Sequence, residues 1–243
     1  MITNIEFNSK CLHGKSITNA MIPDAFDSST AKVLYLLHGY NGNRGSWLDN
    51  THILQYVGDK NLLIVMPDAD NSYYCNLPNG KRYWDYIAIE LPAAIEQKFN
   101  ITLGKTNFFV AGLSMGGYGA LKLAFSYPLM IAAAASFSGA VDINKIYDMD
   151  DSHKERFDGL FGSRQGFLES PDYLQNLINP QKNFPRILIT CGTSDFLYQS
   201  NLEFMDYLKQ KKITADFYTT EGAAHTWDYW DSMLLYAITW MDL

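Results

Sequence analysis

The sequence predicts one α/β domain with a doubly wound, mostly parallel sheet, and three observations support this prediction. Short apolar runs recur along the chain, and their hydrophobicity is continuous rather than alternating, as in strands buried on both faces. A polar turn and then a stretch of helical pattern follow most of these runs, which is the order of βαβ units. The length of 243 residues and the apolar content of 47% fit one large domain with a sizeable core.

The apolar runs predict strands at residues 33–37, 62–66, 108–111, 133–137, 187–191 and 217–219. Between and after them, helices are expected at about 46–57, 86–99, 117–126, 200–211 and 227–241. Pro92 predicts a kink or a later start in the second helix, because proline has no N–H to donate and clashes with the preceding turn. Residues 4–8 and 16–21, on either side of Gly14, predict an antiparallel hairpin at the sheet edge.

Residues 142–184 interrupt this alternation. The segment contains no buried apolar run, and its polar residues are mixed with Phe, Leu and Tyr. A connection of this length is usually functional or has helices of its own. We therefore expect a small helical cap over the strand ends, inserted within a single domain that spans residues 1–243.

Charge and composition exclude several classes of protein. The formal net charge of −7 argues against binding to nucleic acid or to an anionic membrane, which would need clustered Lys and Arg. The only basic cluster, at residues 209–212, is interpreted as the solvated end of a surface helix. No segment has the apolar length needed to span a bilayer, and residues 1–7 lack the pattern of a secretory signal. The widely spaced Cys11, Cys75 and Cys191 indicate neither a disulfide scaffold nor a zinc site. We expect a cytoplasmic protein, unless a leader preceded residue 1, and neither a metal nor another cofactor.

The motif Gly112-Leu113-Ser114-Met115-Gly116 matches GxSxG, follows a predicted buried strand and opens a predicted helix. In this context the serine lies on a sharp strand-to-helix turn, which exposes its hydroxyl. The flanking glycines are expected because side chains there would collide with the neighbouring strand and helix. The alternative is an ordinary serine in a glycine-rich turn. We identify Ser114 as the candidate nucleophile.

A serine hydroxyl needs a base, and in this arrangement the chain order is serine, acid, histidine. Of the five histidines, only His153 and His225 follow Ser114 in the chain. His225 is the candidate base because it lies after the last predicted strand, whereas His153 belongs to a charged stretch that looks solvated. Asp195, which follows the penultimate strand, is the candidate acid. Asp142 is the alternative, since some proteins of this architecture take their acid from the strand after the nucleophile.

Two backbone N–H groups are needed to bind the oxyanion that forms during acyl transfer. The N–H of Met115, directly after the nucleophile, is the first candidate. The second lies in the turn after residue 37, where the N–H of Tyr40 is preferred and that of Gly39 is the alternative. His38 is expected to brace this loop and not to act as a second base.

With these residues assembled, the chain resembles the Putative esterase family of α/β-hydrolases, which includes esterase D (S-formylglutathione hydrolase), bacterial tributyrin esterases, feruloyl esterases and the mycolyltransferases. The resemblance extends over nearly the whole chain. The residues that support it are Leu36-Leu37-His38-Gly39, Val65-Met66-Pro67, Glu90-Leu91-Pro92, Ala111–Gly117 and His225-Thr226-Trp227-Asp228-Tyr229-Trp230. It implies an α/β-hydrolase fold, a Ser114–Asp195–His225 triad, and Tyr40 and Met115 as the oxyanion donors.

The tributyrin and feruloyl esterase branch is the most similar, through Gly39-Tyr40-Asn41-Gly42-Asn43 and Ser46-Trp47-Leu48. It implies a serine carboxylesterase for acetyl to butyryl esters or small aromatic acyl esters, including those of carbohydrates. S-formylglutathione hydrolases typically have a Cys just after the HG motif, where Asn41 and Gly42 stand here. Many members form dimers or tetramers, so a homodimer or homotetramer is implied.

Aromatic residues in or beside the predicted strand-end loops are the candidates for contacting a small-molecule ester. They are Tyr40, Trp47, Tyr73, Trp84, Phe196 and Trp227. Three other functions stay open on the same residues: a thioesterase that acts on S-formylglutathione, an acyltransferase, and a non-catalytic binding module.

Overall fold

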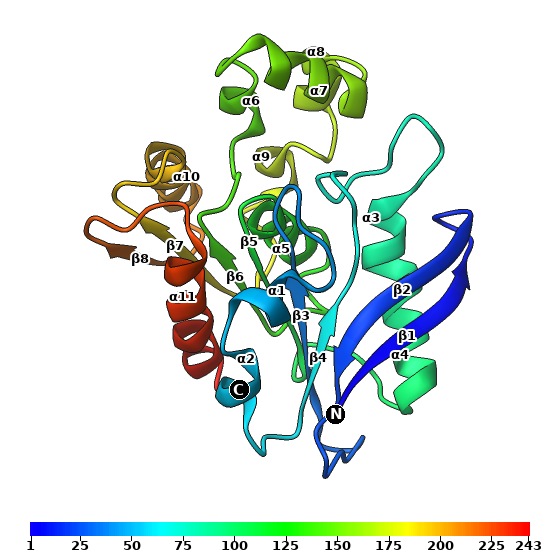
Figure 1. Cartoon of the computed structure of the whole chain (residues 1–243). Helices are drawn as coiled ribbons and strands as arrows, with labels where there is room; N and C mark the ends of the chain where they lie inside the picture. Colours follow the sequence, from blue (N-terminus) through cyan, green and yellow to red (C-terminus); the bar gives the residue numbers. More distant parts are fainter.

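Eight strands form one sheet in the order β1-β2-β4-β3-β5-β6-β7-β8 in the computed structural model, which describes all residues 1–243 (Figure 1). Strands β3 to β8 run parallel to one another, whereas β1 and β2 form an antiparallel hairpin, and β2 pairs antiparallel with β4. The predicted α/β-hydrolase fold and its N-terminal hairpin are confirmed. The strands are β1 (Ile2–Ser9), β2 (Gly14–Met21), β3 (Lys32–Leu37), β4 (Leu62–Met66), β5 (Phe108–Leu113), β6 (Ala133–Phe137), β7 (Arg186–Gly192) and β8 (Asp216–Thr220).

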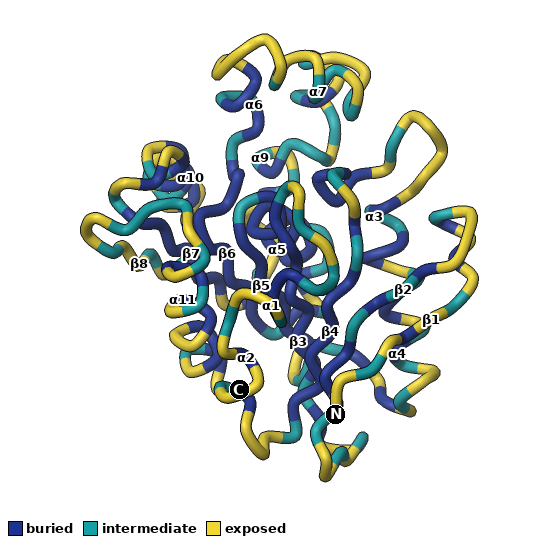
Figure 2. The backbone as a smooth tube through the Cα atoms, in the orientation of Figure 1, coloured by how far each residue is buried: buried dark blue, intermediate teal, exposed yellow.

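Helices cover both faces of the sheet. Alternate residues of β3 enter different cores: Val33 packs with the side of the molecule that holds α4, α5 and α10, and Leu34 with the side that holds α1, α2 and α11. Figure 2 shows the inner strands, such as β3, β5 and β6, in the colour of buried residues. The helices are α1 (Ser46–Asn50), α2 (Ile53–Val57), α3 (Tyr83–Asp85), the π-helix η1 (Tyr86–Glu90), α4 (Leu91–Phe99), α5 (Met115–Ser126), α6 (Ile143–Ile146), α7 (Asp151–Phe161), α8 (Arg164–Glu169), α9 (Leu174–Leu177), α10 (Tyr198–Gln210) and α11 (Trp227–Trp240).

Two predicted helices are divided in the structure. The helix expected at 46–57 is split into α1 and α2, because Thr51 is extended between them. In the helix expected at 86–99, residues 86–90 form a π-turn and α4 begins at Leu91, which puts Pro92 in its first turn. Proline is tolerated there because the first N–H groups of a helix have no partner. The later start predicted from Pro92 is confirmed.

A strand is present at the predicted residues 217–219, but the prediction that it is buried is wrong. Strand β8 lies at the edge of the sheet and pairs only with β7, and its residues are exposed or half-buried. An apolar run of three residues is too short to show whether a strand has neighbours on both sides.

The segment 142–184 contains the four short helices α6 to α9, of which α6, α7 and α8 lie beyond the carboxyl ends of the strands (Figure 1). Its returning part is attached to α5. Asp172 accepts a 2.5 Å hydrogen bond from the buried Lys122 ammonium, and its backbone carbonyl accepts one from the Tyr118 hydroxyl. We call the helices α6 to α8 the outer cap.

No helix combines the length and the apolar character needed to cross a membrane. All three cysteine thiols are free and buried.

Candidate active site

Ser114 lies at the turn between β5 and α5, where its backbone adopts φ 52° and ψ −115°. Positive φ is uncommon for a residue with a side chain, and such strain concentrates at functional sites. A methyl group on Gly112 would lie 2.3 Å from the Gly116 oxygen, and one on Gly116 would lie 2.2 Å from the Leu37 oxygen. Both positions therefore require glycine, for the steric reason that the sequence predicts. The turn leaves Ser114 partly exposed.

The loops that follow β7 and β8 are held together. A methyl group on Gly192 would lie 2.2 Å from the Ala223 oxygen, so only a glycine allows the two loops to approach this closely. The N–H of Ser194 donates to the same Ala223 oxygen at 2.9 Å. This approach brings Asp195 from one loop to His225 from the other.

Asp195 and His225 form a hydrogen-bonded pair. Oδ2 of Asp195 accepts from Nδ1 of His225 at 2.8 Å, and Oδ1 accepts from the N–H of Leu197 at 2.8 Å. The Asp195 side chain is fully buried, whereas 20% of the His225 side chain is exposed. Since a carboxylate only accepts hydrogen bonds, Nδ1 holds the proton and Nε2 keeps a free lone pair.

Ser114 and His225 line one cavity of about 600 Å³ at the carboxyl ends of the strands. Ser114 Oγ makes no hydrogen bond to His225 here, and contacts of this kind are often loose before a substrate binds. The His225 ring is fixed between Phe196 and Trp230, whose ring centroids each lie 4.7 Å from its own. Of the aromatic residues predicted to contact substrate, this cavity contains Tyr40, Tyr73, Phe196 and Trp227.

The loop after β3 lies directly against Ser114, since a methyl group on Gly39 would be 3.5 Å from Ser114 Cβ. The Gly39 carbonyl oxygen accepts from His38 Nδ1 at 2.8 Å and from the Gly42 N–H at 3.0 Å. In a trans peptide the C=O and the next N–H point in opposite directions, so the N–H of Tyr40 points away from these partners. The Met115 N–H, as the first of α5, has no acceptor within the helix.

Both ring nitrogens of His38 form hydrogen bonds to the backbone. Nε2 accepts a 3.0 Å hydrogen bond from the Ala69 N–H, so Nδ1 carries the proton that it donates to Gly39. Burial lowers the pKa of the His38 imidazole, which favours this neutral form. A fully buried ring with both nitrogens in use cannot act as a base, and the structure places His38 as a brace for the loop.

Two of the aromatic residues predicted to contact substrate, Trp47 and Trp84, do not line this cavity. Trp47 is fully buried, donates its indole N–H to the Leu37 oxygen at 3.2 Å, and packs edge-on against Trp227. Trp84 packs against α5 residues outside the cavity lining, with its ring against Tyr127 and the Lys122 ammonium 4.2 Å from its centroid. Both tryptophans support the scaffold.

The alternatives for the base and the acid occupy other places. His153 is not a solvated residue, because its side chain is only 24% exposed and lines the cavity from α7, with Nδ1 2.8 Å from Asp150. Asp142 precedes α6, where burial raises the pKa of its carboxyl, and it makes no hydrogen bond to His225.

Sequence reasoning missed several residues that line the cavity, of which Trp230 and Arg156 have the largest side chains. Trp230, one helical turn after Trp227, faces His225, and its indole N–H donates to Ser138 Oγ at 3.2 Å. Arg156 of α7 extends over the Tyr40 ring, with its guanidinium carbon 4.4 Å from the ring centroid. Helical spacing could have pointed to Trp230, but nothing local marks Arg156, since its place depends on how the cap folds over the sheet.

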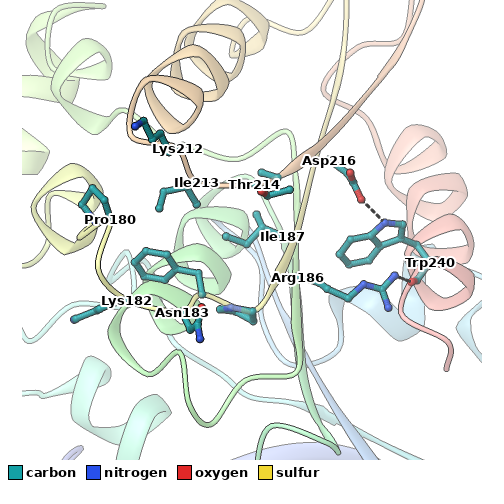
Figure 3. Close-up of a pocket in the computed structure, with 13 residues that line it drawn as sticks. Pro180, Lys182, Asn183, Arg186, Ile187, Lys212, Ile213, Thr214, Asp216 and Trp240 are labelled. Atoms are coloured by element: carbon teal, nitrogen blue, oxygen red, sulfur yellow. Dashed lines mark hydrogen bonds between the residues drawn. The ribbon is translucent and has the colours of Figure 1, made fainter.

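A second cavity, of about 400 Å³, lies at the opposite end of the strands, next to Arg186 and Asp216, the first residues of β7 and β8 (Figure 3). Its lining contains no serine, cysteine or histidine, and its Arg186 is occupied by Asp242 and by the Trp240 carbonyl. No group of three His, Cys, Asp or Glu side chains is placed to hold a metal ion.

The fold and the site together define the class of protein, an α/β hydrolase. The family model described as Putative esterase matches residues 9–241, and the chain belongs to this family of carboxylic ester hydrolases.

Three relatives match over nearly their whole length. FphF, a fluorophosphonate-binding serine hydrolase of Staphylococcus aureus, is 32% identical with a TM-score of 0.86, and the match covers 99% of this chain and 98% of that one. The S-formylglutathione hydrolase FrmB of the same organism is 31% identical with a TM-score of 0.84, and 99% of each chain is covered. An acetyl esterase of Caldicellulosiruptor saccharolyticus is 29% identical over 99% of this chain and 97% of its own.

Proposed function

We propose that the chain is a serine carboxylesterase that hydrolyses short-chain acyl esters, from acetyl to butyryl, or small aromatic acyl esters, through an acyl-enzyme on Ser114. The observation that supports it best is the shared cavity, in which a strained serine and a histidine backed by a buried carboxylate line one wall. The name of the acetyl esterase relative is consistent with a short acyl group.

In the proposed mechanism, His225 Nε2 removes the proton from Ser114 Oγ as this oxygen attacks the ester carbonyl. The N–H groups of Tyr40 and Met115 donate to the oxyanion, and His225 then protonates the departing alcohol. Water repeats these steps and releases the acid. Asp195 keeps the His225 ring in its orientation and stabilises the imidazolium that forms.

The cavity lining supports a small or flat acyl group. Tyr40, Tyr73, Phe196, Trp227 and Trp230 surround the space beside Ser114 and His225. Aromatic rings bury apolar acyl groups well, and a flat aromatic acyl group stacks on them.

The test is Ser114→Ala, assayed with 4-nitrophenyl acetate and with a fluorophosphonate probe. We expect the variant to lose hydrolysis and labelling together, while wild type shows both. Retention of most of the hydrolysis by the variant would contradict the proposal. Measuring kcat/KM across acetyl, butyryl, octanoyl and feruloyl esters and an acetylated sugar then defines the acyl group.

A thioesterase acting on S-formylglutathione is the second candidate, because FrmB is similar over the full length of both chains. Including S-formylglutathione in the same series separates the two, since a thioesterase would show its highest kcat/KM there. Product analysis with added sugar acceptors would reveal an acyltransferase.

A further inference from the structure

Arg156 is the only lysine or arginine side chain that lines the cavity. Of the 19 residues that line it, His153, Arg156 and His225 are the ones with ionisable nitrogen, and none is an Asp or a Glu. The whole chain, in contrast, has a formal net charge of −7. The cavity lining therefore has one fixed positive charge, that of Arg156, and no carboxylate, in an acidic protein.

Arg156 differs from the other arginines of the chain because no carboxylate pairs with it. The chain has five arginines, and the other four each face an aspartate: Arg44 with Asp68, Arg82 with Asp85, Arg164 with Asp148 and Arg186 with Asp242. On α7, Lys154 holds Asp158 at 2.6 Å, and neither Asp151 nor Glu155 forms an ion pair with Arg156. Asp150, which caps the helix, lies beside His153. A half-buried guanidinium without a counter-ion can bind an anion that enters the cavity.

The position of Arg156 makes it a wall of the substrate site. Its guanidinium carbon lies 4.4 Å from the centroid of the Tyr40 ring, and Tyr40 belongs to the loop that contacts Ser114. It also lies near the Tyr73 hydroxyl: burial raises the pKa of Tyr73 to about 12, against the opposite effect of the Arg156 charge. Stacking on a ring uses the face of a guanidinium and leaves the N–H groups at its edge, and those that the Tyr73 hydroxyl does not use match the oxygens of a carboxylate.

We propose that Arg156 binds a carboxylate on the substrate, so that the preferred esters are those of an acid or an alcohol that bears a second, ionised carboxyl group. This inference rests on the proposed esterase function and specifies its substrate class. The carboxylate belongs either to the acyl part, as in a half-ester of a dicarboxylic acid, or to the alcohol part. The chemistry is the same in both cases, and the two parts are separated by the choice of substrates.

The test compares matched substrates with wild type, Arg156→Gln and Arg156→Lys. For the acyl part the pair is monomethyl succinate and methyl butyrate, and for the alcohol part it is 4-acetoxybenzoate and 4-methylphenyl acetate. We expect Arg156→Gln to lower kcat/KM for the carboxylate member of one pair by about 10- to 100-fold, mainly through KM, as for a lost charge-assisted hydrogen bond. The neutral members should change less than about 2-fold, and Arg156→Lys should recover part of the loss.

The matched control is Lys154→Gln, which removes one positive charge from the same helix at a side chain that is 66% exposed. It should leave all four substrates unaffected. Equal losses with Arg156→Gln on neutral and anionic substrates would show that Arg156 only supports Tyr40, and unchanged rates on both would show no role; either result overturns the proposal. Wild type should also be inhibited competitively by free succinate, and absence of inhibition would count against the anion site.

Failure of the proposed function has a different signature. If wild type hydrolysed none of the neutral esters and Ser114 were not labelled by a fluorophosphonate, the esterase proposal itself would be wrong. If the neutral esters were hydrolysed and only the preference for the carboxylate were missing, the Arg156 proposal alone would be wrong.

Discussion

Replacing Asp195 with asparagine exchanges one oxygen for an NH2 group at the centre of a buried pair. The backbone N–H of Leu197 donates to one end of the side chain, and His225 Nδ1 lies at the other end. Because the Leu197 N–H can only donate, it fixes the oxygen of the new amide on its own side, and the NH2 then faces His225. His225 must accept with Nδ1 and hold its proton on Nε2, the atom that should receive the proton of Ser114.

The expected loss has two parts. Restoring the active tautomer requires turning the amide, which leaves the buried Leu197 N–H unpaired at about 1–3 kcal/mol. Losing the charged acceptor of the imidazolium removes about 1.5–3 kcal/mol more from the transition state. At about 1.4 kcal/mol per tenfold, the sum corresponds to a fall in kcat/KM of roughly 10²- to 10⁴-fold.

The assay is kcat/KM for 4-nitrophenyl acetate, with thermal unfolding to show that Asp195→Asn is folded. The control is Asp142→Asn, which changes the alternative acid and should lower kcat/KM less than about 3-fold, since Asp142 makes no hydrogen bond to His225. A loss of less than about 10-fold for Asp195→Asn, or a larger loss for Asp142→Asn, would refute the assignment of the acid.

Three further predictions concern stability. Asp172→Asn leaves the buried Lys122 ammonium without its anion, which should lower the free energy of unfolding by about 3–5 kcal/mol. In a thermal scan, Tm should fall by ~2–4 °C for each kcal/mol that is lost. An unchanged Tm would contradict a structural role for this pair. Gly116→Ala forces a methyl group to within 2.2 Å of a backbone oxygen and should strongly lower the urea midpoint. The control is Gly104→Ala, whose added methyl group has no atom within 4 Å and should change the free energy of unfolding by less than about 0.5 kcal/mol. Similar effects of the two substitutions would be inconsistent with the tight turn. Burial lowers the pKa of His38 in the folded chain, so the unfolded chain binds this proton at higher pH. The free energy of unfolding should therefore fall as pH drops below about 6.5, by up to ~1.4 kcal/mol per pH unit. The urea midpoint of His38→Gln should depend less on pH in that range, and equal slopes for the variant and wild type would argue against the effect.

The order of the elements follows from local sequence, which is why most of it could be predicted. Runs such as 62–66 and 133–137 are strands with the predicted bounds, because a short, largely apolar run between turns favours a strand buried on both faces. Whether a strand lies at the edge of the sheet cannot be predicted from its own residues. The apolar run of β8 resembles that of an inner strand, but β8 lies at the edge because no other strand pairs with its outer side. Likewise Pro92 indicates where α4 begins, but not the π-turn that precedes it.

The candidate site shows the same division. Ser114, Asp195 and His225 lie at strand ends, and the carboxyl ends of parallel strands meet at one edge, so their proximity could be expected from chain order. Packing in the folded chain decides whether a tryptophan near a strand end points into the cavity or into the scaffold. The sequence alone therefore does not show that the side chains of Trp47 and Trp84 pack outside the cavity. Arg156 lies 42 residues after the nucleophile in a segment without strands, and only the folded cap brings it to the cavity.

The attachment of Asp172 to α5 divides the segment 142–184 into two parts with different freedom to vary. The returning part is joined to the helix that starts at the nucleophile, so a change there would disturb the chemistry. The outer cap, which supplies Arg156 and His153, has no such attachment through Lys122, and its helices can be exchanged or resized while the catalytic helix keeps its place. Diversification of substrate range in this architecture is therefore expected to concentrate in α6 to α8.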